Sequence, residues 1–582
     1  MTSFNSKKSL RRVSFISLSF LFISSLFIQG CKTGTKGIES GSNTTLEASI
    51  NQGRNVFENS CAACHSFERD GIGPNLAGLT RHLSTEEIID FISNPKKVID
   101  SGNKRAVNLQ KKYKSVMPSY SMLGKEKLAS LVSFIHTYKD VPKPVDINEE
   151  GILEDPIPHQ IEKSNFVVNL EFSFQIPASN EELPNTRITK LWGQPNTNEI
   201  YVCDINGKLY RVKNNKPEVY MDVQALMPNF KQRSGWATGF GSFAFHPDFE
   251  NNGLLYTTHT EPIGTKNADY TLPEGLSGQL QWIVQEWKTD NPKGKTFKGS
   301  NRELFRIDMA TQAHGMQNID FNPTAQKGDK DYGKLYIGIG DGGAVQMKFP
   351  EVANGKHSPW GSILRIDPTG TNSANGMYGI PSDNPFVNIT GEKVAKEVYA
   401  NGFRNPHRFS WTNTGKMISA NIGQHNIEAV YVIKPGANHG WPTREGTFGI
   451  NTQESVRKIY KLTEEEMKDG VTYPTLEYDH DEGNAVCGGF VYTGSNIPSL
   501  TGMYIFGDIL KGKLYYADES QMEAGRAIDF KEMRIALDGK ETTLLEMTNN
   551  GHAKLRIGKD ANGDIYLFSM NDGKVYQLVS EK

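Results

Sequence analysis

The segment Cys61-Ala62-Ala63-Cys64-His65 limits what the chain around it can fold into. Two thiols separated by two residues can each add to one vinyl group of a haem, and the histidine that follows can bind the iron from the proximal side. A thiol redox pair or half of a zinc site is the alternative, but no second pair of cysteines with this spacing exists to complete a zinc site. The segment therefore predicts a domain with one covalent haem, attached through Cys61 and Cys64 and ligated by His65.

Helical patterns lie on both sides of this segment, within residues 46–140. Two apolar stripes at helical spacing consist of Ile50, Gly53, Val56 and Phe57 before it, and of Leu128, Leu131, Val132 and Ile135 after it. Ser84 and Glu87 have the spacing of a capping box, which predicts a third, short helix ending near Pro95. We therefore predict a small all-α domain.

The iron of a single haem needs a second axial ligand, and the candidates are Met117, Met122 and His82. Met117 is followed by Pro118 in a non-helical stretch, whereas Met122 is spaced like an apolar residue that packs under the last predicted helix. We therefore predict that Met117 is the distal ligand. Methionine ligation raises the haem potential, which suits electron acceptance better than oxygen activation.

Residues 46–140 resemble class I cytochromes c. The attachment motif, the loop Gly71-Ile72-Gly73-Pro74-Asn75-Leu76, the Met117-Pro118 pair and a terminal helix occur in the order found in that family. The resemblance implies that the proline-containing loop backs the proximal histidine.

The amino terminus is predicted to be a targeting segment. Four basic residues precede an apolar run over residues 13–28, and Gly30 stands just before Cys31, as in a bacterial lipoprotein signal. We predict a signal peptide over residues 1–30, lipidation of Cys31 and a flexible polar tether over residues 31–45. An uncleaved membrane anchor is the alternative, although the run is short for a membrane span. The expected location is the periplasmic or outer-membrane side of a Gram-negative-type bacterium, with the lipid anchor in the membrane.

A chain of 582 residues is too long for one ordinary core, so at least two domains are expected. The net charge of -2 gives no support to nucleic-acid binding, which normally needs a basic surplus. Of the five cysteines, Cys203 and Cys487 are left without a predicted role. A disulfide and two buried thiols both remain open for them.

The rest of the chain is predicted to be a proline-rich, semi-rigid linker over residues 141–165 and a β domain over residues 166–582. Alternating apolar runs flank Asn206-Gly207 and again Asp572-Gly573, and a looser copy runs from Met503 to Tyr516. Such dipeptides between alternating runs are strong hairpin signals, because both turn positions need positive φ. Repeated hairpins favour an all-β propeller of about six blades, with an array of β-sandwiches as the alternative.

Several loops between the predicted strands carry residues suited to chemistry, as propeller loops commonly do. These are His314, Asp341, Arg404 with Asn405, residues 423–428 and His439. In this order they resemble the PQQ-dependent glucose/sorbosone dehydrogenase family. The resemblance is carried by residues 243–249, His314, and residues 336–341, 402–406, 438–442 and 488–492.

The resemblance implies a six-bladed propeller with PQQ and calcium near its axis. By position, His314 matches the general base that takes the proton of the substrate hydroxyl, and Asp341 matches a carboxylate that contacts the substrate. Arg404 and Asn405 match contacts to the quinone. A histidine suits the role of base, because it can be neutral near pH 7 and accept a proton.

The same resemblance implies calcium ligands in the 423–428 segment. Gly423 and Gln424 match positions that bind calcium through main-chain oxygens, and Glu428 matches an acidic ligand. Oxygen ligands suit calcium, which is a hard cation.

The chain also departs from the soluble glucose enzymes of this family. It has Ala237, Ala313 and Asn496 near the positions where those enzymes have a glutamine, an acid and a quinone-binding lysine. Lys511 and Lys513 are the candidates to supply the missing cationic contact with PQQ.

The predicted function is that of a lipid-anchored quinohaemoprotein. It would oxidise a sugar (aldose) or related alcohol by hydride transfer to PQQ and pass the electrons through the haem to an external acceptor, such as a cytochrome or respiratory component. The alternatives are a calcium-dependent propeller lactonase or hydrolase and a non-enzymatic carbohydrate-binding propeller. Fusion to a cytochrome argues against both alternatives, because neither needs an electron outlet.

Overall fold

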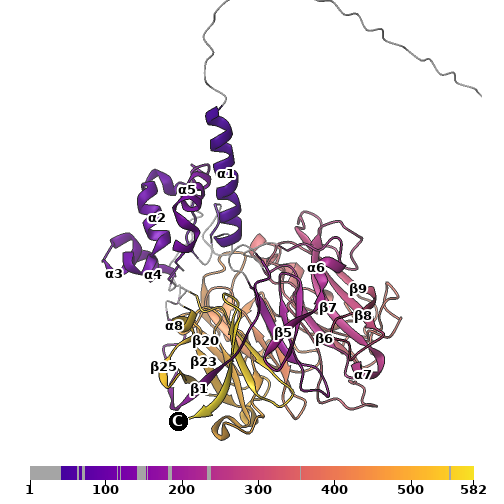
Figure 1. The fold of residues 1–582 in the computed structure, drawn as a ribbon. Coiled ribbons are helices and arrows are strands. Elements are labelled where there is room, and N and C mark those ends of the chain that lie inside the picture. The colour runs from indigo at the N-terminus through magenta and orange to yellow at the C-terminus, as the bar shows by residue number, and fades with distance from the viewer. Residues whose placement is uncertain are drawn as a thin grey trace, which may run out of the picture. The chain divides into compact units, whose positions relative to one another are not determined.

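The computed structural model describes residues 41–61, 65–67, 73–113, 116–117, 119–140, 153, 155–180, 186–232, 237–353, 355–548 and 552–582. The predicted signal peptide, the predicted lipidation site Cys31 and the second haem cysteine Cys64 lie outside these residues. Among the residues described, no helix is both long enough and apolar enough to cross a membrane. Helices come first along this part of the chain, and strands follow (Figure 1).

The helical part is built from α1 (Gly41–Ser60), α2 (Thr85–Ser93), α3 (Pro95–Asp100), α4 (Lys104–Tyr113) and α5 (Gly124–Ile135), with the 3₁₀ turns η1 (Leu79–Arg81) and η2 (Ser121–Leu123). Its core joins the two apolar stripes predicted from the sequence. Val56 and Phe57 from α1 pack with Leu128, Leu131 and Ile135 from α5. The small all-α domain is thereby confirmed.

Gly53 allows α1 and α5 to cross closely. A Cβ atom at this position would lie 1.9 Å from the main-chain oxygen of Ser130. Any larger residue would therefore push the two helices apart. This close approach explains why a glycine stands within an otherwise apolar stripe.

The first residues of α2 follow the sequence prediction, and those of α1 do not. The Ser84 hydroxyl accepts a hydrogen bond from the Glu87 amide at 3.2 Å, and the Glu87 carboxylate accepts one from the Ser84 amide at 2.8 Å. This is the predicted capping box. The predicted tether over residues 31–45 is wrong at its end, because α1 already begins at Gly41. Serine, asparagine and threonine are common at helix starts, so their polarity does not exclude a helix.

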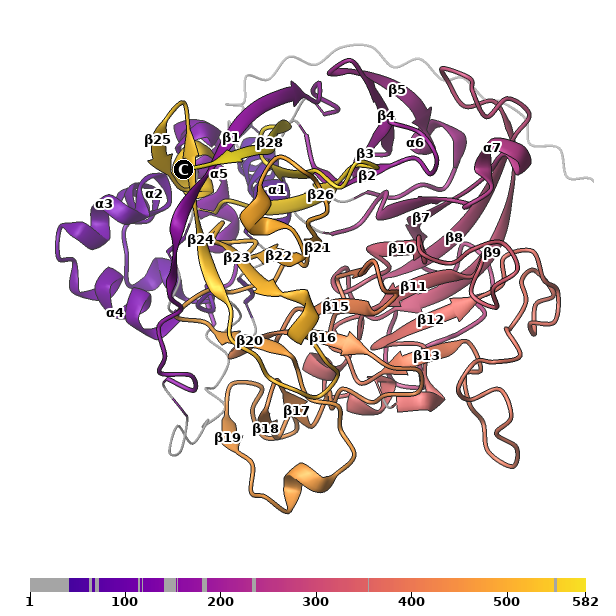
Figure 2. The same cartoon turned by 90° about the horizontal axis from the view of Figure 1, so that it is seen from below.

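Among the residues described, the main strands of the β-rich part form six groups of four around a common centre (Figure 2), and we call each group a blade. Three of the blades are separate sheets, and the other three are joined into one 13-stranded sheet by parallel pairing between neighbouring blades. Blade 1 is β2 (Ile188–Gly193), β3 (Ile200–Asp204), β4 (Lys208–Lys213) and β5 (Lys216–Asp222); blade 2 is β6 (Ser242–Phe245), β7 (Leu254–Pro262), β8 (Leu280–Thr289) and β9 (Gly299–Met309). Blade 3 is β10 (Asn318–Phe321), β11 (Leu335–Ile339), β12 (Ser362–Ile366) and β13 (Val398–Asn401).

Blade 4 is β14 (Arg408–Trp411), β15 (Met417–Asn421), β16 (Ile427–Ile433) and β20 (Leu476–Asp479). Blade 5 is β21 (Phe490–Val491), β22 (Met503–Gly507), β23 (Leu514–Asp518) and β24 (Lys531–Leu537). Blade 6 is β26 (Leu555–Lys559), β27 (Ile565–Ser569), β28 (Lys574–Glu581) and β1 (Lys163–Gln175). Six blades around one centre make a six-bladed β-propeller, so the propeller prediction is confirmed and the array of sandwiches is excluded.

Blade 6 closes the ring with strands from distant parts of the chain. β1 pairs antiparallel with β28, from Val168 opposite Glu581 to Gln175 opposite Lys574. The predicted linker over residues 141–165 is therefore wrong at its end, because β1 begins at Lys163. The Ile157 amide also donates a hydrogen bond to a carboxylate oxygen of Asp479 in blade 4 at 3.1 Å. Both partners of β1, the strands β24 and β28, lie far away in sequence, so the local pattern does not show where β1 begins.

The predicted hairpins are present. Asn206-Gly207 lies in the turn between β3 and β4, and Asp572-Gly573 lies in the turn between β27 and β28. β22 and β23 form the looser third copy. The signal was reliable because a tight turn between antiparallel strands is specified locally.

Smaller elements lie in the connections between the strands of the blades. A three-stranded insertion between β16 and β20 consists of β17 (Arg444–Glu445), β18 (Phe448–Ile450) and β19 (Ile459–Lys461). The remaining elements are the short helices α6 (Val223–Leu226), α7 (Phe249–Asn252) and α8 (Leu544–Thr548), the strand β25 (Lys540–Thr542) and the 3₁₀ turns at 345–347, 350–353, 355–357, 466–468, 498–500 and 519–521.

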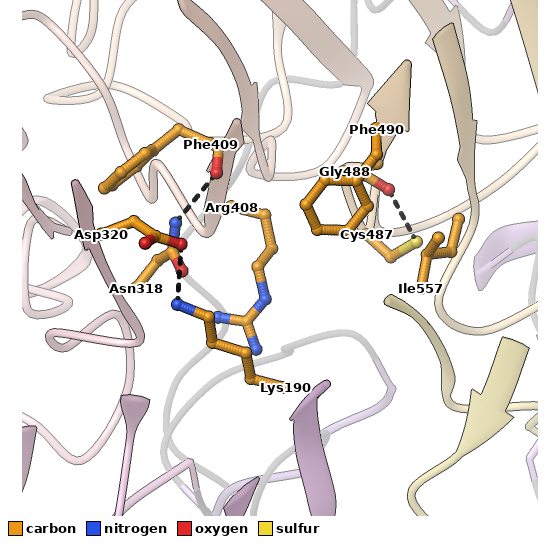
Figure 3. Close-up of a pocket in the computed structure, with 10 residues that line it drawn as sticks. Lys190, Asn318, Asp320, Arg408, Phe409, Cys487, Gly488, Phe490 and Ile557 are labelled. Atoms are coloured by element: carbon orange, nitrogen blue, oxygen red, sulfur yellow. Dashed lines mark hydrogen bonds and ion pairs between the residues drawn. The ribbon is translucent and has the colours of Figure 1, made fainter. Parts of the chain in front are cut away.

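A buried lysine ties three blades together near their centre. The Lys190 ammonium group, on β2, donates to the main-chain oxygens of Phe243 at 2.9 Å and Ile319 at 2.8 Å, and it pairs with Asp320 at 3.0 Å. Figure 3 shows this ion pair in a pocket that Arg408 also lines. The Lys190 side chain is only 5% exposed, so its charge depends on these acceptors.

Replacing Asp320 by asparagine should destabilise the propeller by about 3 kcal/mol, because a buried charge would lose its counter-ion. Denaturant unfolding followed by tryptophan fluorescence measures this loss. Glu541→Gln is the matched control, since the Glu541 pair with Arg534 at 2.6 Å lies at the surface, where water screens it, and its loss should leave the stability nearly unchanged. Equal losses in the two variants would contradict the role assigned to Asp320.

Candidate active site and haem site

His65 is held as a proximal haem ligand would be. Two main-chain hydrogen bonds tie His65 to the end of α1: the Cys61 amide donates to the Phe57 oxygen at 2.8 Å, and the His65 amide donates to the Cys61 oxygen at 2.9 Å. The His65 Nδ1 atom lies 2.8 Å from the main-chain oxygen of Pro74, to which its N–H donates. In this tautomer Nε2 keeps its lone pair, so Nε2 is the nitrogen that can bind iron.

Gly73 brings the loop that follows against the His65 ring. A Cβ atom at residue 73 would lie 2.4 Å from His65 Cε1, so only a glycine permits this approach. Cys61, Leu76 and Leu79 lie beside the apolar core of the helical part. An oriented imidazole, a neighbouring thiol and apolar surroundings fit a covalent haem c.

The distal candidates are placed differently. Met117 lies in a non-helical segment. The nearby Tyr120 is fixed, because its hydroxyl donates a hydrogen bond to the main-chain oxygen of Ser60 at 2.8 Å. His82 is exposed just after η1. The side chain of Met122 lies outside the described residues. Met117 therefore stays the predicted ligand.

His314 and Asp341 form a pair on neighbouring loops. His314 lies between β9 and β10, and Asp341 follows β11. The His314 Nδ1 atom is 2.6 Å from one carboxylate oxygen of Asp341, which also accepts the Gly343 amide at 2.8 Å. The second oxygen accepts the indole N–H of Trp441 at 3.1 Å. Asp341 is thereby fixed, and it holds His314 with Nδ1 protonated and Nε2 as the basic nitrogen.

The surroundings keep this histidine neutral. Burial lowers the pKa of His314, and the nearby Arg404 lowers it further, against the opposite effect of Asp341. Although burial raises the pKa of Asp341, His314 and Arg404 hold it below its ordinary value. The pair therefore combines an ionised carboxylate with a neutral imidazole, as a general base requires.

Arg404 connects this pair to the next blade. Its main-chain oxygen accepts the Asp341 amide at 2.8 Å, and its Nε–H donates to the side-chain oxygen of Gln424 at 2.8 Å. The amides of Arg404 and Asn405 both donate to the side-chain oxygen of Asn421, at 3.1 and 2.9 Å. The structure thus brings together His314, Asp341 and Arg404, as expected from the resemblance.

The predicted acidic calcium ligand has other partners. One Glu428 oxygen accepts the amides of Gly423 at 3.2 Å and Val486 at 2.9 Å, and the other lies 3.2 Å from His480 Nε2. In the described part of the chain, no group of three or more His, Cys, Asp or Glu residues is arranged to hold a metal ion. These protein donors hold the Glu428 carboxylate, and its role as an acidic calcium ligand stays a prediction. The main-chain oxygens of Gly423 and Gln424 remain a prediction.

Lys511 and Lys513 do not fit the predicted contact with PQQ. The Lys511 ammonium group donates to the main-chain oxygens of His480 at 3.1 Å and Asp481 at 2.6 Å. Lys513 forms ion pairs with Glu482 at 2.5 Å and Glu532 at 3.1 Å. Main-chain oxygens thus engage the Lys511 ammonium group and two carboxylates pair with Lys513, which the sequence spacing alone could not reveal.

Three buried arginines were missed by the sequence analysis. Burial and the neighbouring Arg408 lower the pKa of Arg556 to about 9, and burial lowers those of Arg187 and Arg408 to about 10. Within the described part, Nε of Arg556 and Nη1 of Arg187 are buried without an acceptor. These donors fit a ligand with several carboxylates, such as PQQ. The sequence signal was an arginine within an apolar strand, as Arg556 is in β26.

Cys203 and Cys487 are buried and do not form a disulfide. Burial raises the pKa of each thiol to about 12. Of the two possibilities left open by the sequence, two buried thiols is therefore correct.

The fold and the site together define a class: a small helical haem domain joined to a six-bladed propeller that holds a carboxylate-oriented histidine near the buried Arg404. The chain belongs to the glucose/sorbosone dehydrogenase family, since residues 190–575 match the family described as "Glucose / Sorbosone dehydrogenase". Residues 50–139 match the family described as "Cytochrome c". The two predicted resemblances are thereby confirmed.

Individual relatives are distant. The chain is 26% identical over 395 residues to the HIPL1 protein of Arabidopsis thaliana, covering 59% of this chain and 53% of that protein. It is 25% identical over 377 residues to quinoprotein glucose dehydrogenase B of Acinetobacter calcoaceticus, covering 61% of this chain and 71% of that protein. The PQQ-bound aldose sugar dehydrogenase of Streptomyces coelicolor aligns with 17% identity and a TM-score of 0.48, over 73% of this chain and 100% of that one. The match thus spans about half the length of HIPL1.

Proposed function

We propose that the chain is a cytochrome-linked, PQQ-dependent dehydrogenase of a sugar or related alcohol. The observation that carries the proposal is the neutral, carboxylate-oriented His314 near the buried Arg404, in a chain that also has a cytochrome c domain. The name of the Acinetobacter relative, a quinoprotein glucose dehydrogenase, supports the substrate class. The cytochrome domain favours this function over a lactonase or a binding protein, because neither of those uses an electron outlet.

In this proposal His314 Nε2 accepts the proton of the substrate hydroxyl. Asp341 stabilises the imidazolium that forms, and Trp441 keeps the carboxylate in place through its indole N–H. Arg404, Asn405 and Arg556 would hold PQQ. When bound, PQQ would supply an electrophilic quinone that accepts the hydride from the carbon bearing the substrate hydroxyl. Cys61, Cys64 and His65 would hold the haem, which gives a one-electron outlet.

The proposal extends to location and partner. The lipoprotein pattern that ends at Cys31 supports a membrane-anchored protein facing the periplasm. The electron acceptor would be an external redox protein, such as a cytochrome or a respiratory component.

Reconstitution tests the proposed function. The purified, haem-loaded protein is mixed with PQQ, with and without calcium, and then with a panel of aldoses and alcohols. We expect the absorbance of reduced haem to appear with at least one sugar and only when PQQ is present. If the haem stays oxidised across the panel, yet a chemical reductant reduces it, the proposal is wrong.

A further inference from the structure

The insertion between β16 and β20 places a buried carboxylate against the loop that supports Arg404. Glu445, at the end of β17, is 4% exposed. One of its oxygens accepts the amides of Gln424 at 2.7 Å, His425 at 2.9 Å, Asn426 at 2.9 Å and Ile427 at 3.2 Å. The other oxygen accepts the Asn426 side-chain amide at 3.0 Å. One carboxylate thus accepts hydrogen bonds from every main-chain amide of residues 424–427. We call this segment the 424–427 loop.

The turn that follows Glu445 is fixed by a second glutamate. The turn between β17 and β18 is fixed by Glu477 of β20, whose carboxylate accepts the Thr447 amide at 3.0 Å and the Thr447 hydroxyl at 2.6 Å. Gly446, within this turn, has a φ of 62°, which favours glycine. The position of Glu445 is therefore set by the body of blade 4.

The 424–427 loop leads directly to the reacting histidine. Gln424 presents its side-chain oxygen to Arg404 Nε at 2.8 Å, and the Arg404 main-chain oxygen accepts the amide of Asp341. Asp341 then bonds to His314 at 2.6 Å. The chain of contacts from Glu445 to His314 contains no gap.

We propose that Glu445 is a positioning residue, which fixes the 424–427 loop so that Gln424 orients the Arg404 guanidinium beside the His314–Asp341 pair. Its effect on catalysis rests on the proposed function, but its effect on the site does not. Within the described structure, Glu445 bonds to the 424–427 loop and not to His314, so we expect it to act through Arg404.

Hydrogen exchange tests the first contact. In Glu445→Ala, the amides of residues 424–427 lose their acceptor. They should exchange at least about tenfold faster than in the wild-type protein. Glu445→Gln keeps one acceptor oxygen and should show a smaller increase. Glu454→Ala is the matched control, because Glu454 lies in the same insertion with its side chain 56% exposed, and it should leave these amides unchanged. Unchanged exchange in Glu445→Ala would overturn the proposal.

A titration of His314 tests the second step. It uses the full-length, haem-loaded protein without PQQ, labelled at histidine Cε1 and assigned with the His314→Ala variant. Arg404 lowers the pKa of His314. In Glu445→Ala the Arg404 guanidinium is no longer held beside His314, so the pKa of His314 should rise. Simple removal of a negative charge would lower it, and the sign therefore separates the two explanations. Faster amide exchange with an unchanged or lowered pKa would overturn the positioning role.

Activity forms the third arm. If the dehydrogenase function holds, Glu445→Ala should reduce sugar-driven haem reduction at least about tenfold, mainly in kcat, while chemical reduction of the haem is unchanged. If the unchanged protein oxidises no sugar, the proposed function fails, but the exchange and titration results still decide the role of Glu445. Glu445→Gln, which preserves the shape of the side chain, serves the same measurements should Glu445→Ala not fold.

Discussion

Replacing His314 by alanine should slow sugar-driven haem reduction by about 10²- to 10⁴-fold, because the substrate hydroxyl would lose its general base. The haem itself should still be reduced by a chemical reductant at the normal rate. Stopped-flow absorbance of the reconstituted protein measures both rates. His357→Ala is the matched control, since His357 is an exposed histidine that lies against the surface segment at Glu392 and Lys393.

The pH dependence adds a signature that a merely structural change would not give. A base must be deprotonated, so the rate should rise with pH and level off above the pKa of His314. Burial and Arg404 hold that pKa below the ordinary value of 6.5, and the rising limb should therefore lie below pH 6.5. A rate that His314→Ala leaves unchanged, or a limb centred well above pH 6.5, would remove His314 from the mechanism.

Replacing Met117 by alanine should remove the distal ligand of the haem. The ferric protein should lose the near-infrared charge-transfer band of methionine ligation, and its reduction potential should fall, because a methionine ligand raises the potential. Absorbance spectroscopy and a redox titration measure these changes.

The matched control for this ligand is Met122→Ala, which changes the other methionine of the same segment. Its spectrum should match that of the unchanged protein. If the Met117→Ala spectrum were unchanged instead, the ligand would be Met122 or His82. Either result can be obtained without PQQ or sugar, so it does not depend on the proposed function.

Local patterns predicted much of this fold. The capping box at Ser84 and the hairpins at Asn206-Gly207 and Asp572-Gly573 each depend on a few neighbouring residues, and all three are present. The distance between partners explains what was missed. β1 depends on strands that end the chain, so the sequence near Lys163 looked like part of a linker.

In the candidate site too, some residues could be predicted from the sequence and their contacts could not. His314, Asp341 and Arg404 could be predicted because the family resemblance marks them by position. The indole N–H of Trp441 reaches Asp341 across 100 positions of sequence, and no local rule predicts that contact. Lys513 looked available for a cofactor, but Glu482 and Glu532 hold its charge. A charged residue is therefore easy to find in a sequence, whereas its counter-ion is found only in the fold.

The pairing of β1 with β28 has a consequence for how the protein is made. β1 leaves the ribosome hundreds of residues before β28, so β1 waits without this partner until residues 574–581 have been made. The helical domain precedes β1 and can therefore fold, and acquire its haem, while the ring is still open. Loss of β28 would leave β1 with β24 as its remaining partner strand, so a stop codon before Lys574 would also weaken the start of the propeller.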